Sequence, residues 1–325
     1  MSGKGQAMTP EEERCAEEKR LDRIDEAFRK GDLEALRAAV DDPGVLPNGL
    51  VHETVGTALV YAIYRSPLAF IRALLEIGAD PNAPADDGFP PLIAALSCTR
   101  DVPGATKRTD VVQTLRLLLA FGADPNQRGI NDYTALHMAV GERNALAVQI
   151  LLDAGADPDL RTRIDDYDTP EEMARSAGLS IIADMLARRG RPLNRRLRSG
   201  LTLLVDLPGD GDEVRRQHNY LVRLRMWLKR GEPVRWPSAW GPVGTARLEE
   251  DGETLLTEVR TNRGQLIAGL FYGMEGMRVG STRRLEIAPH LAYGERGVPG
   301  VIPPNSVLAA EITILSAREP AARQG

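Results

Sequence analysis

Apolar residues follow two different periods along this chain of 325 residues, and the change comes near residue 200. Before it, leucine and alanine recur at the spacing of amphipathic helices. Beyond it, apolar and polar positions alternate in short runs, at residues 201–207, 220–228, 254–259, 283–288 and 307–315. Such alternation is typical of half-buried strands. The pattern predicts a helical first part and a strand-rich second part, interrupted by one short helix at residues 266–273.

A motif recurs within the helical part. GADPN begins at Gly78 and at Gly122, GADPD begins at Gly155, and each copy follows a pair of leucines. The second and third copies lie 33 residues apart. A threonine precedes the first helix in several copies, as in TALHMA at Thr134, and can cap it. The motif glycines suit the left-handed backbone at which helices often end.

These motifs and their period resemble the ankyrin repeat. The resemblance implies an α-helical solenoid of about five repeats over residues 17–190, with a weaker copy at residues 21–40 as the N-terminal cap. The 44-residue gap between the first two GADPN copies indicates an insertion near residues 97–109. His137 is interpreted as structural, because the resemblance assigns its position to hydrogen bonds between neighbouring loops.

The ankyrin resemblance also implies a surface for a protein partner, formed by the concave face and the loop tips. The candidate contact residues are Arg128, Tyr133, Arg161, Arg163 and Tyr167.

Charge also divides the chain. Residues 1–187 hold 19 Lys and Arg against 31 Asp and Glu, a net −12, whereas residues 188–325 hold 22 against 15, a net +7. Such asymmetry often separates units. Residues 188–200 contain six arginines, a proline and glycines, so residues 191–200 are predicted as an arginine-rich linker. Because no stacking aromatics or nucleic-acid motif accompany these arginines, a nucleic-acid partner is not expected.

Residues 276–314 read GMRVGSTRRLEIAPHLAYGERGVPGVIPPNSVLAAEITI, and PGDGDEV stands earlier, at residues 208–214. The order of AYG, PG and IPPNS resembles the C-terminal half of an FKBP-type peptidyl-prolyl isomerase. The resemblance covers most of residues 201–318 and implies an α+β half-barrel, an antiparallel sheet around one short helix. The expected domain order is a polar tail at 1–16, repeats at 17–190, the linker, the FKBP-like domain at 201–318 and a tail at 319–325.

The resemblance implies rotation about X-Pro bonds, whose barrier of about 18–20 kcal/mol arises from amide resonance. A water-poor pocket with aromatic walls holds the twisted imide in this family. By resemblance, Ile267 supplies the backbone N–H that binds the peptide and Tyr293 the tyrosine hydroxyl, and these are the candidate catalytic residues. The candidate substrate-binding residues are Leu224, Val234, Leu266, Leu270, Val298, Val301, Ile302 and Ala310.

Several of these positions depart from the family. The tryptophan floor falls on Leu270 and the wall phenylalanine on Ala310, so both aromatics are missing. Leu224 stands for a tyrosine, and Val234 and Arg235 stand for a Phe-Asp pair, so a base replaces an acid. Tyr293 and the Gly- and Pro-rich residues 294–305 fit both a substrate site and a structural role.

An extension between Gly231 and Ile267 contains Trp236 and Trp240. These tryptophans either replace the missing pocket aromatics or cover a core. The second interpretation is favoured, because large aromatics near prolines in a long loop more often pack than bind. Phe271 and Tyr272 follow Leu270 directly and are expected in packing or at the surface, since neighbouring helical residues point in different directions.

Two functions stay open. The favoured one is a protein–protein interaction scaffold, whose repeats bind a partner and whose FKBP-like domain binds polypeptide with weak or lost isomerase activity. The alternative is an active isomerase, a folding helper that the repeats bring to its clients, possessing the intact Ile267 and Tyr293. Proline-containing peptides are ligands in both, and neither needs a cofactor.

Other classes find little support. Cys15 and Cys98 are the only thiols and the four histidines lack ligand spacing, so neither a disulfide framework nor a metal site is predicted. The sequence has no phosphate-binding loop and no GxSxG motif. No apolar run approaches the roughly 20 residues that span a bilayer. The first twenty residues lack the apolar core of a secretory signal, so a cytoplasmic location without a membrane partner is expected.

Overall fold

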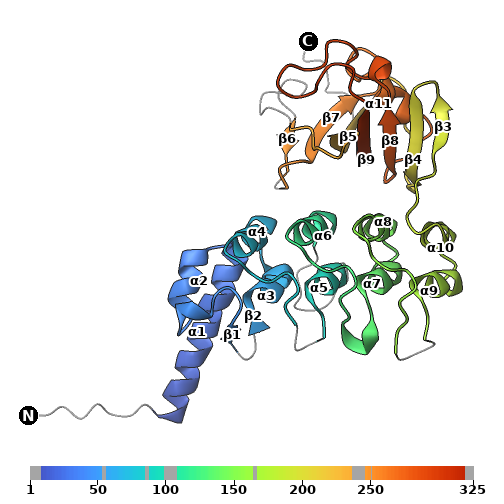
Figure 1. Ribbon diagram of the computed structural model, residues 1–325. Helices are drawn as coiled ribbons and strands as arrows, with labels where there is room; N and C mark the ends of the chain where they lie inside the picture. Colours follow the sequence, from blue (N-terminus) through green and yellow to red (C-terminus); the bar gives the residue numbers. More distant parts are fainter. Residues whose placement is uncertain are drawn as a thin grey trace, which may run out of the picture. The chain divides into compact units, whose positions relative to one another are not determined.

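The computed structural model describes residues 9–52, 56–84, 88–98, 108–163, 167–235, 246–249 and 251–318. The chain forms two compact units, residues 1–190 and 191–325 (Figure 1). The first unit is mainly helical, with a two-stranded sheet of β1 (Leu50–His52) and β2 (Gly56–Thr57), and the second contains a seven-stranded antiparallel sheet among its described residues. The predicted change of period near residue 200 is confirmed.

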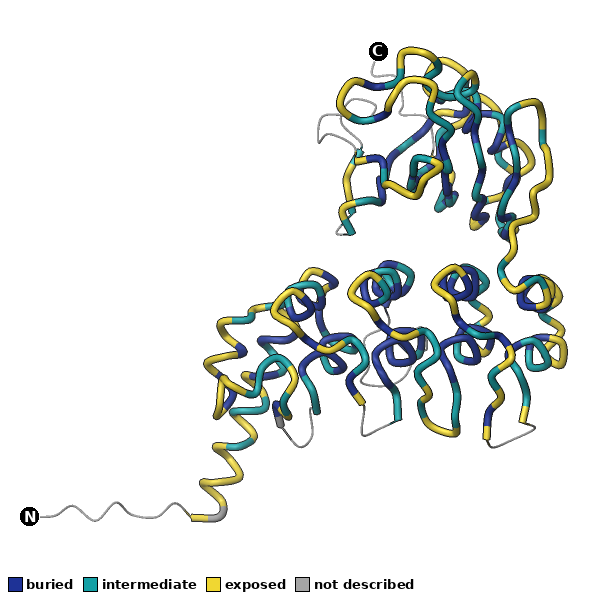
Figure 2. The backbone as a smooth tube through the Cα atoms, viewed as in Figure 1, coloured by how far each residue is buried: buried dark blue, intermediate teal, exposed yellow. Residues whose placement is uncertain are grey.

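Helices of the first unit stack in two rows (Figure 1). After α1 (Pro10–Lys30) and α2 (Leu33–Ala39), the helices are α3 (Ala58–Arg65), α4 (Leu68–Glu76), α5 (Pro91–Ser97), α6 (Val111–Ala120), α7 (Ala135–Gly141), α8 (Ala145–Asp153), α9 (Pro170–Ser176) and α10 (Ser180–Ala187). Each odd-numbered helix from α3 contacts the next odd-numbered one, and the even-numbered helices behave likewise. Apolar faces of both rows form a continuous core, in which Leu74, Leu118 and Leu151 are fully buried (Figure 2). The predicted insertion falls between α5 and α6, and residues 99–107 lie outside the described residues.

An asparagine ladder joins the loops after α2, α4, α6 and α8. Asn82 Nδ2 donates to the carbonyl of Gly122 at 3.0 Å, and Asn82 Oδ1 accepts from the Asp124 amide at 2.6 Å. Asn48 and Asn126 make the same pair of bonds to the loop that follows them. Each bond satisfies a loop backbone group that no helix pairs. The last residue of each GADPN motif therefore fixes the spacing of consecutive loops.

The motif glycines lie at helix ends, and the third motif ends the ladder. Gly78, Gly122 and Gly155 have φ of +96°, +89° and +90°, which confirms their predicted role at helix ends. The third motif ends in Asp159, whose carboxylate accepts from Arg189 at 2.6 Å. Aspartate lacks the amide donor that the ladder needs, so the change from Asn to Asp ends the ladder at this loop.

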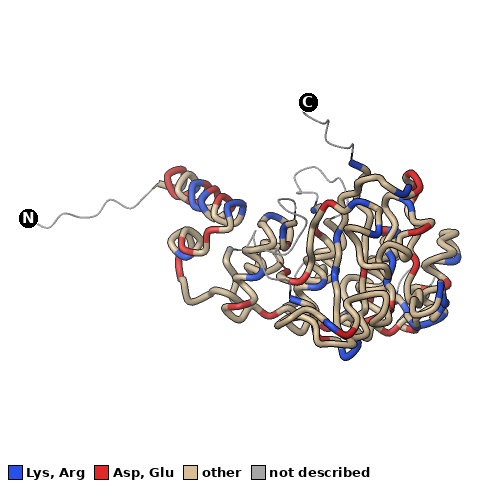
Figure 3. Tube along the Cα trace, turned by 90° about the horizontal axis from the view of Figure 1, so that it is seen from above, with Lys and Arg blue, Asp and Glu red and all other residues tan. Residues whose placement is uncertain are grey.

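The N-terminal tail prediction needs correction. Helix α1 begins at Pro10, so residues 10–16 of the predicted tail are helical. Thr9 caps it, Glu12 completes the capping box, and Glu11, Glu12 and Glu13 place negative charge in the first turn (Figure 3). The acidic run that looked like a solvated tail is a helix start, because its charges complement the helix dipole.

The second unit is a sheet with one short helix packed against it. Its strands are β3 (Arg195–Arg198), β4 (Leu201–Leu207), β5 (Asn219–Leu228), β6 (Arg247–Leu248), β7 (Leu255–Arg260), β8 (Thr282–Ile287) and β9 (Leu308–Arg318). The order is β3-β4-β8-β9-β5-β7-β6, and every pairing is antiparallel. The helix, α11 (Ala268–Gly273), contacts β4 and β8. The expected antiparallel sheet around one short helix is present.

The linker prediction also needs correction. Four of the residues predicted as linker form β3, which pairs with β4 at the edge of the sheet. Leu197 packs against the core of this unit, and Arg195 forms an ion pair with Asp206 at 3.4 Å. Cross-strand bonds and one half-buried leucine outweigh a composition that is typical of linkers.

Two glycines let α11 lie directly on β8. A Cβ atom on Gly269 would come within 2.3 Å of Ile287, and one on Gly273 within 2.2 Å of Leu285. Real Cβ contacts are longer, so a larger residue at either position would push the helix from the sheet. This close approach sets the distance of Ile267 and Leu270 from the sheet.

Candidate functional site

The ten candidate residues of the sheet unit lie in one apolar cluster, formed by the inner face of the sheet, α11 and the loop before β9. Seven are buried within it: Leu224, Val234, Leu266, Leu270, Val298, Ile302 and Ala310. The other three, Ile267, Tyr293 and Val301, are half-buried and pack against it. The structure therefore brings all ten together, although they come from five segments of the chain.

The three positions at which aromatic side chains of the family are missing are buried from solvent. Leu270 is 4% exposed, Val234 2% and Ala310 0%. Ala310 faces Leu285 on β8 and Met226 on β5 in the register of the sheet, so its place is enclosed by neighbouring strands. Side chains this buried offer little surface to a ligand. The surface that a peptide can touch comes mainly from Ile267, Tyr293 and Val301.

Ile267 presents an available backbone donor. It is the N-cap of α11, with φ −59° and ψ 148°, and no side chain caps the helix. Its carbonyl accepts from the Phe271 amide at 3.0 Å, but its own N–H has no partner among the residues that the structure describes. An N–H at a helix start points out of the helix and needs an external acceptor.

Tyr293 presents a second donor. Burial raises the pKa of Tyr293 to about 12, so its hydroxyl stays protonated at neutral pH. Within the described parts of the chain, that hydroxyl makes no hydrogen bond. The Tyr293 side chain is half-buried, so its hydroxyl can donate to an acceptor that a ligand supplies at the edge of the apolar cluster.

Upstream, the structure modifies the expected exchange of an acid for a base. Val234 N donates to Met226 O at 2.8 Å and its side chain enters the core. Arg235, the next residue, is exposed, so this cation lies at the surface and not within the apolar cluster. Trp236 and Trp240 lie outside the described residues.

The sequence interpretation missed Arg283, a nearly buried residue of β8 that is 8% exposed. Its Nε donates to Asp206 Oδ1 on β4 at 2.8 Å. Its terminal nitrogen donates to the carbonyls of Gly273 at 2.9 Å and Glu275 at 2.7 Å, at the end of α11. Arg283 therefore joins two strands to the helix that carries Ile267. Strand alternation indicates only that residue 283 faces the core, since it shares its parity with Leu285 and Ile287, and does not indicate its partners.

In the helical unit, the three candidate arginines form hydrogen bonds within and between neighbouring loops. Arg163 Nε donates to Asp132 Oδ2 at 2.9 Å, and Arg128 donates to the Arg161 carbonyl at 3.0 Å. Arg161 forms a two-pronged pair with Glu172, each contact at 2.8 Å. The side chains of Arg161 and Arg163 are more than half exposed, and that of Arg128 is 40% exposed. All three connect successive loops. Any partner would compete with these internal carboxylates.

Two tyrosines of the same set differ. The Tyr133 ring lies 5.4 Å from the His137 ring, and Tyr133 is half-buried. Tyr167 is 60% exposed and has φ of +56°, a backbone region that tyrosine rarely adopts. Tyr167 is therefore the apolar side chain of this set that a partner could cover.

His137 links two loops from a fully buried position. Its Nδ1 lies 3.2 Å from the Thr134 amide, and its Nε2 lies 3.1 Å from the Asp168 carbonyl. These contacts require a neutral ring that accepts at Nδ1 and donates at Nε2. Burial lowers the pKa of His137, which keeps the ring neutral. The structural interpretation of His137 therefore agrees with its contacts.

We expect His137→Ala to lower the free energy of unfolding of the helical unit by about 2 kcal/mol at pH 7. Because the folded pKa lies below the unfolded one, the unfolded state binds more protons as pH falls below about 6.5, and stability declines there. Denaturant unfolding at several pH values should show this decline in the wild type and a smaller one in His137→Ala. Equal slopes in both proteins would contradict the assignment.

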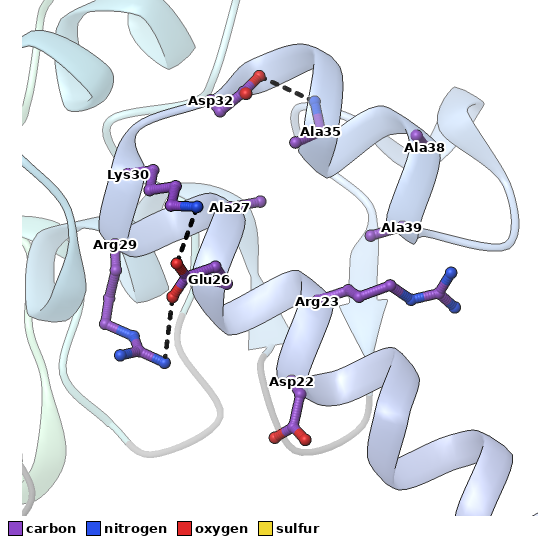
Figure 4. A pocket seen from close by; sticks show the side chains of 10 residues that line it. All are labelled: Asp22, Arg23, Glu26, Ala27, Arg29, Lys30, Asp32, Ala35, Ala38 and Ala39. Carbon is purple, nitrogen blue, oxygen red and sulfur yellow. Dashed lines mark hydrogen bonds and ion pairs between the residues drawn. The ribbon is translucent and has the colours of Figure 1, made fainter.

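A surface groove of about 650 Å³ lies between α1 and α2 (Figure 4). It is lined by Ala27, Ala35, Ala38 and Ala39 and by both acidic and basic side chains. Glu26 pairs with Lys30 at 3.0 Å and with Arg29 at 3.5 Å, so its charges are largely balanced internally. None of the candidate residues lines it.

Within the described ranges, no three His, Cys, Asp or Glu side chains come together as metal ligands. Over the same ranges, no helix is both long enough and apolar enough to cross a membrane.

Two sequence families match the chain. The family described as FKBP-type peptidyl-prolyl cis-trans isomerase matches residues 248–315, and the ankyrin repeat matches residues 131–163. Both matches coincide with the motifs that indicated them.

Three relatives illustrate the extent of the likeness. FK506-binding protein 1A of Neurospora crassa is 37% identical over 117 residues, which are 36% of this chain and 87% of the relative. FK506-binding protein 2 of Candida glabrata is 42% identical over 79 residues, 22% of this chain and 58% of the relative. FK506-binding protein 4 of Chaetomium thermophilum is 53% identical over 57 residues, 18% of this chain and only 12% of the relative.

The chain thus spans just over half of one relative and a small part of another, but nearly all of the Neurospora crassa protein. Together with the antiparallel sheet, α11 and the AYG and IPPNS motifs, this likeness shows that the chain belongs to the FKBP-type peptidyl-prolyl cis-trans isomerase family, with an ankyrin repeat in its helical unit.

Proposed function

We propose that this protein is an interaction scaffold with two binding units. Its FKBP-type unit binds proline-containing polypeptide and catalyses isomerisation weakly. Its helical unit is an ankyrin solenoid that holds a protein partner. The observation that carries the proposal is the pair of unpartnered donors, the Ile267 amide and the Tyr293 hydroxyl, beside an apolar cluster.

Binding is supported by these two donors, because each gains a hydrogen bond when a peptide carbonyl approaches. The apolar side chains around them would receive the proline ring. Weak catalysis is supported by Leu270 and Ala310, which are buried and lack the aromatic surface of the family pocket. Fast turnover requires the pocket to bind the twisted imide more tightly than the planar one. Without the aromatic surface the twisted imide gains fewer contacts, so turnover is slow.

The partner-binding role of the helical unit is supported by its two rows of helices and by the regular loops that the asparagine ladder holds. Stacked repeats of this kind offer an extended surface to a partner. Arg161, Arg163 and Tyr167 lie at the loop tips and are the proposed contacts.

The alternative, an efficient isomerase that the repeats bring to clients, is favoured by the same two donors. Turnover distinguishes the two proposals, since a scaffold needs affinity but not speed.

A peptide titration tests the binding site. We expect Tyr293→Phe and Ile267→Pro each to weaken binding of a proline-containing peptide about tenfold, because each removes one hydrogen-bond donor that a peptide carbonyl would use. Ile267 already has the φ that proline requires, so the backbone can accept the change. Fluorescence anisotropy of a labelled peptide with the full chain gives the dissociation constants.

Ile267→Ala is the matched control, because it removes a larger part of the side chain but keeps the N–H. We expect Ile267→Ala to bind the peptide more tightly than Ile267→Pro does. Equal loss in the two variants would show that the side chain and not the amide holds the peptide.

A further inference from the structure

Three arginines from separate segments converge on the two aromatic rings of α11. The Arg198 guanidinium lies 3.5 Å from the centroid of the Tyr272 ring, and that of Arg263 lies 5.7 Å from it. The Arg216 guanidinium lies 5.5 Å from the centroid of the Phe271 ring. The rings stand edge to face, with centroids 5.2 Å apart. Cation–π contact thus gathers three positive charges around the Phe271 and Tyr272 rings of one short helix.

Negative charge does not balance this cluster. Glu275 lies 2.5 Å from Arg216 and 3.8 Å from Arg198, and is the one carboxylate paired with these arginines in the described part of the chain. Arg263 has no ion-pair partner there, and it is exposed. Stacking on a ring uses the flat face of a guanidinium and leaves the N–H groups at its edge free to bind an anion. The Arg198, Arg216 and Arg263 side chains therefore form an accessible site of net positive charge.

The arginine cluster lies next to the proposed peptide site. Ile267, the N-cap of α11, and Tyr272 both pack against the apolar cluster, and their separation of five residues corresponds to roughly 8 Å along the helix. An extended peptide advances about 3.3 Å per residue, so a peptide held at the Ile267 amide reaches the cluster within about three residues. Arg263 precedes Ile267 by four positions, in a turn that Asn262 stabilises by accepting from the Gly264 and Gln265 amides.

We propose that Arg198, Arg216 and Arg263 form a subsite for an acidic side chain of the client, a few residues from its proline. The inference rests on the proposed peptide site and adds a substrate class to it: proline-containing segments with a nearby Asp or Glu. Arg263 makes the main contact, because the other two arginines already share Glu275. Bidentate guanidinium–carboxylate pairing supplies both attraction and orientation.

Two pairs of synthetic peptides test the proposal with the full chain. Every peptide contains one proline, and the two members of a pair differ only in carrying Glu or Gln at one position. That position lies three residues before the proline in one pair and three residues after it in the other. At an ionic strength of about 0.02 M, where screening is weak, we expect the Glu peptide of at least one pair to bind about fivefold more tightly than its Gln partner. Salt at about 0.5 M should remove most of that difference.

Arg263→Gln should abolish the preference and leave the affinity for the Gln peptide unchanged. The matched control is Arg247→Gln, an exposed arginine on β6 at the opposite edge of the sheet from β3, and it should keep the preference. Equal affinity for Glu and Gln peptides in the wild type, or a preference that survives Arg263→Gln, would overturn the subsite alone. Absence of binding by every peptide would overturn the proposed peptide site and the subsite together.

Discussion

Replacing Arg283 by leucine is expected to lower the free energy of unfolding of the sheet unit by about 3 kcal/mol. The change leaves Asp206 without its closest cation and leaves the carbonyls of Gly273 and Glu275 without their donor. Leucine fills the space but cannot satisfy these groups, and unpaired buried polar groups are costly. Urea unfolding of the full chain, followed by a signal from the sheet unit, measures the loss.

The same change should weaken peptide binding, because Arg283 holds the end of the helix that presents Ile267. Arg260→Leu is the control, since Arg260 is exposed at the end of β7 and a surface change of this kind stays within about 0.5 kcal/mol. Arg283→Lys should recover part of the lost stability, as it keeps one charge and some donors. If Arg283→Leu lowered the free energy of unfolding no more than Arg260→Leu does, packing alone would hold α11 on the sheet.

Arg108 is the buried arginine of the helical unit that, like Arg283, binds backbone carbonyls at a helix end and a carboxylate. Its side chain is 5% exposed, and one terminal nitrogen donates to the carbonyls of Ile63 at 2.9 Å and Ser66 at 2.8 Å, where α3 ends. The rest of the guanidinium pairs with both oxygens of Asp110, at 2.9 and 2.8 Å. We expect Arg108→Leu to destabilise this unit by about 3 kcal/mol, because it orphans two carbonyls and one carboxylate together.

Circular dichroism follows this loss, since helices dominate the unit. Arg37→Leu is the control: Arg37 pairs with Glu34 at 2.7 Å on the surface, and exposed pairs contribute about 0.5 kcal/mol. The sheet unit should keep its own transition in Arg108→Leu. A loss below about 1 kcal/mol would mean that water satisfies the carbonyls that Arg108 reaches.

Much of the fold could be predicted because local signals agree with one another. Gly78, Gly122 and Gly155 repeat at helix ends, and each adopts the positive φ that its place in the motif predicts. The strand runs at residues 201–207 and 283–288 alternate in sequence and are buried on one side in the structure. Such features depend on neighbouring residues only, so a sequence shows them directly.

The corrections concern features that depend on distant partners. Composition suggested a linker at Arg195–Arg198, but pairing with β4 makes it a strand. Arg283 and Arg108 act through groups far away in the sequence, so their roles could not be predicted from local pattern alone. The candidate pocket residues were named by resemblance and do lie together, whereas the availability of the Ile267 amide required the structure.

The most direct test of the account is isomerisation of a proline-containing peptide by the full chain, with FK506-binding protein 1A of Neurospora crassa measured in parallel. We expect saturable binding together with a kcat/KM about 100-fold below that of the relative, a difference of about 2.7 kcal/mol in transition-state stabilisation. This difference follows from the aromatic surface that Leu270 and Ala310 do not provide. A kcat/KM equal to that of the relative would contradict the scaffold proposal and establish an efficient isomerase.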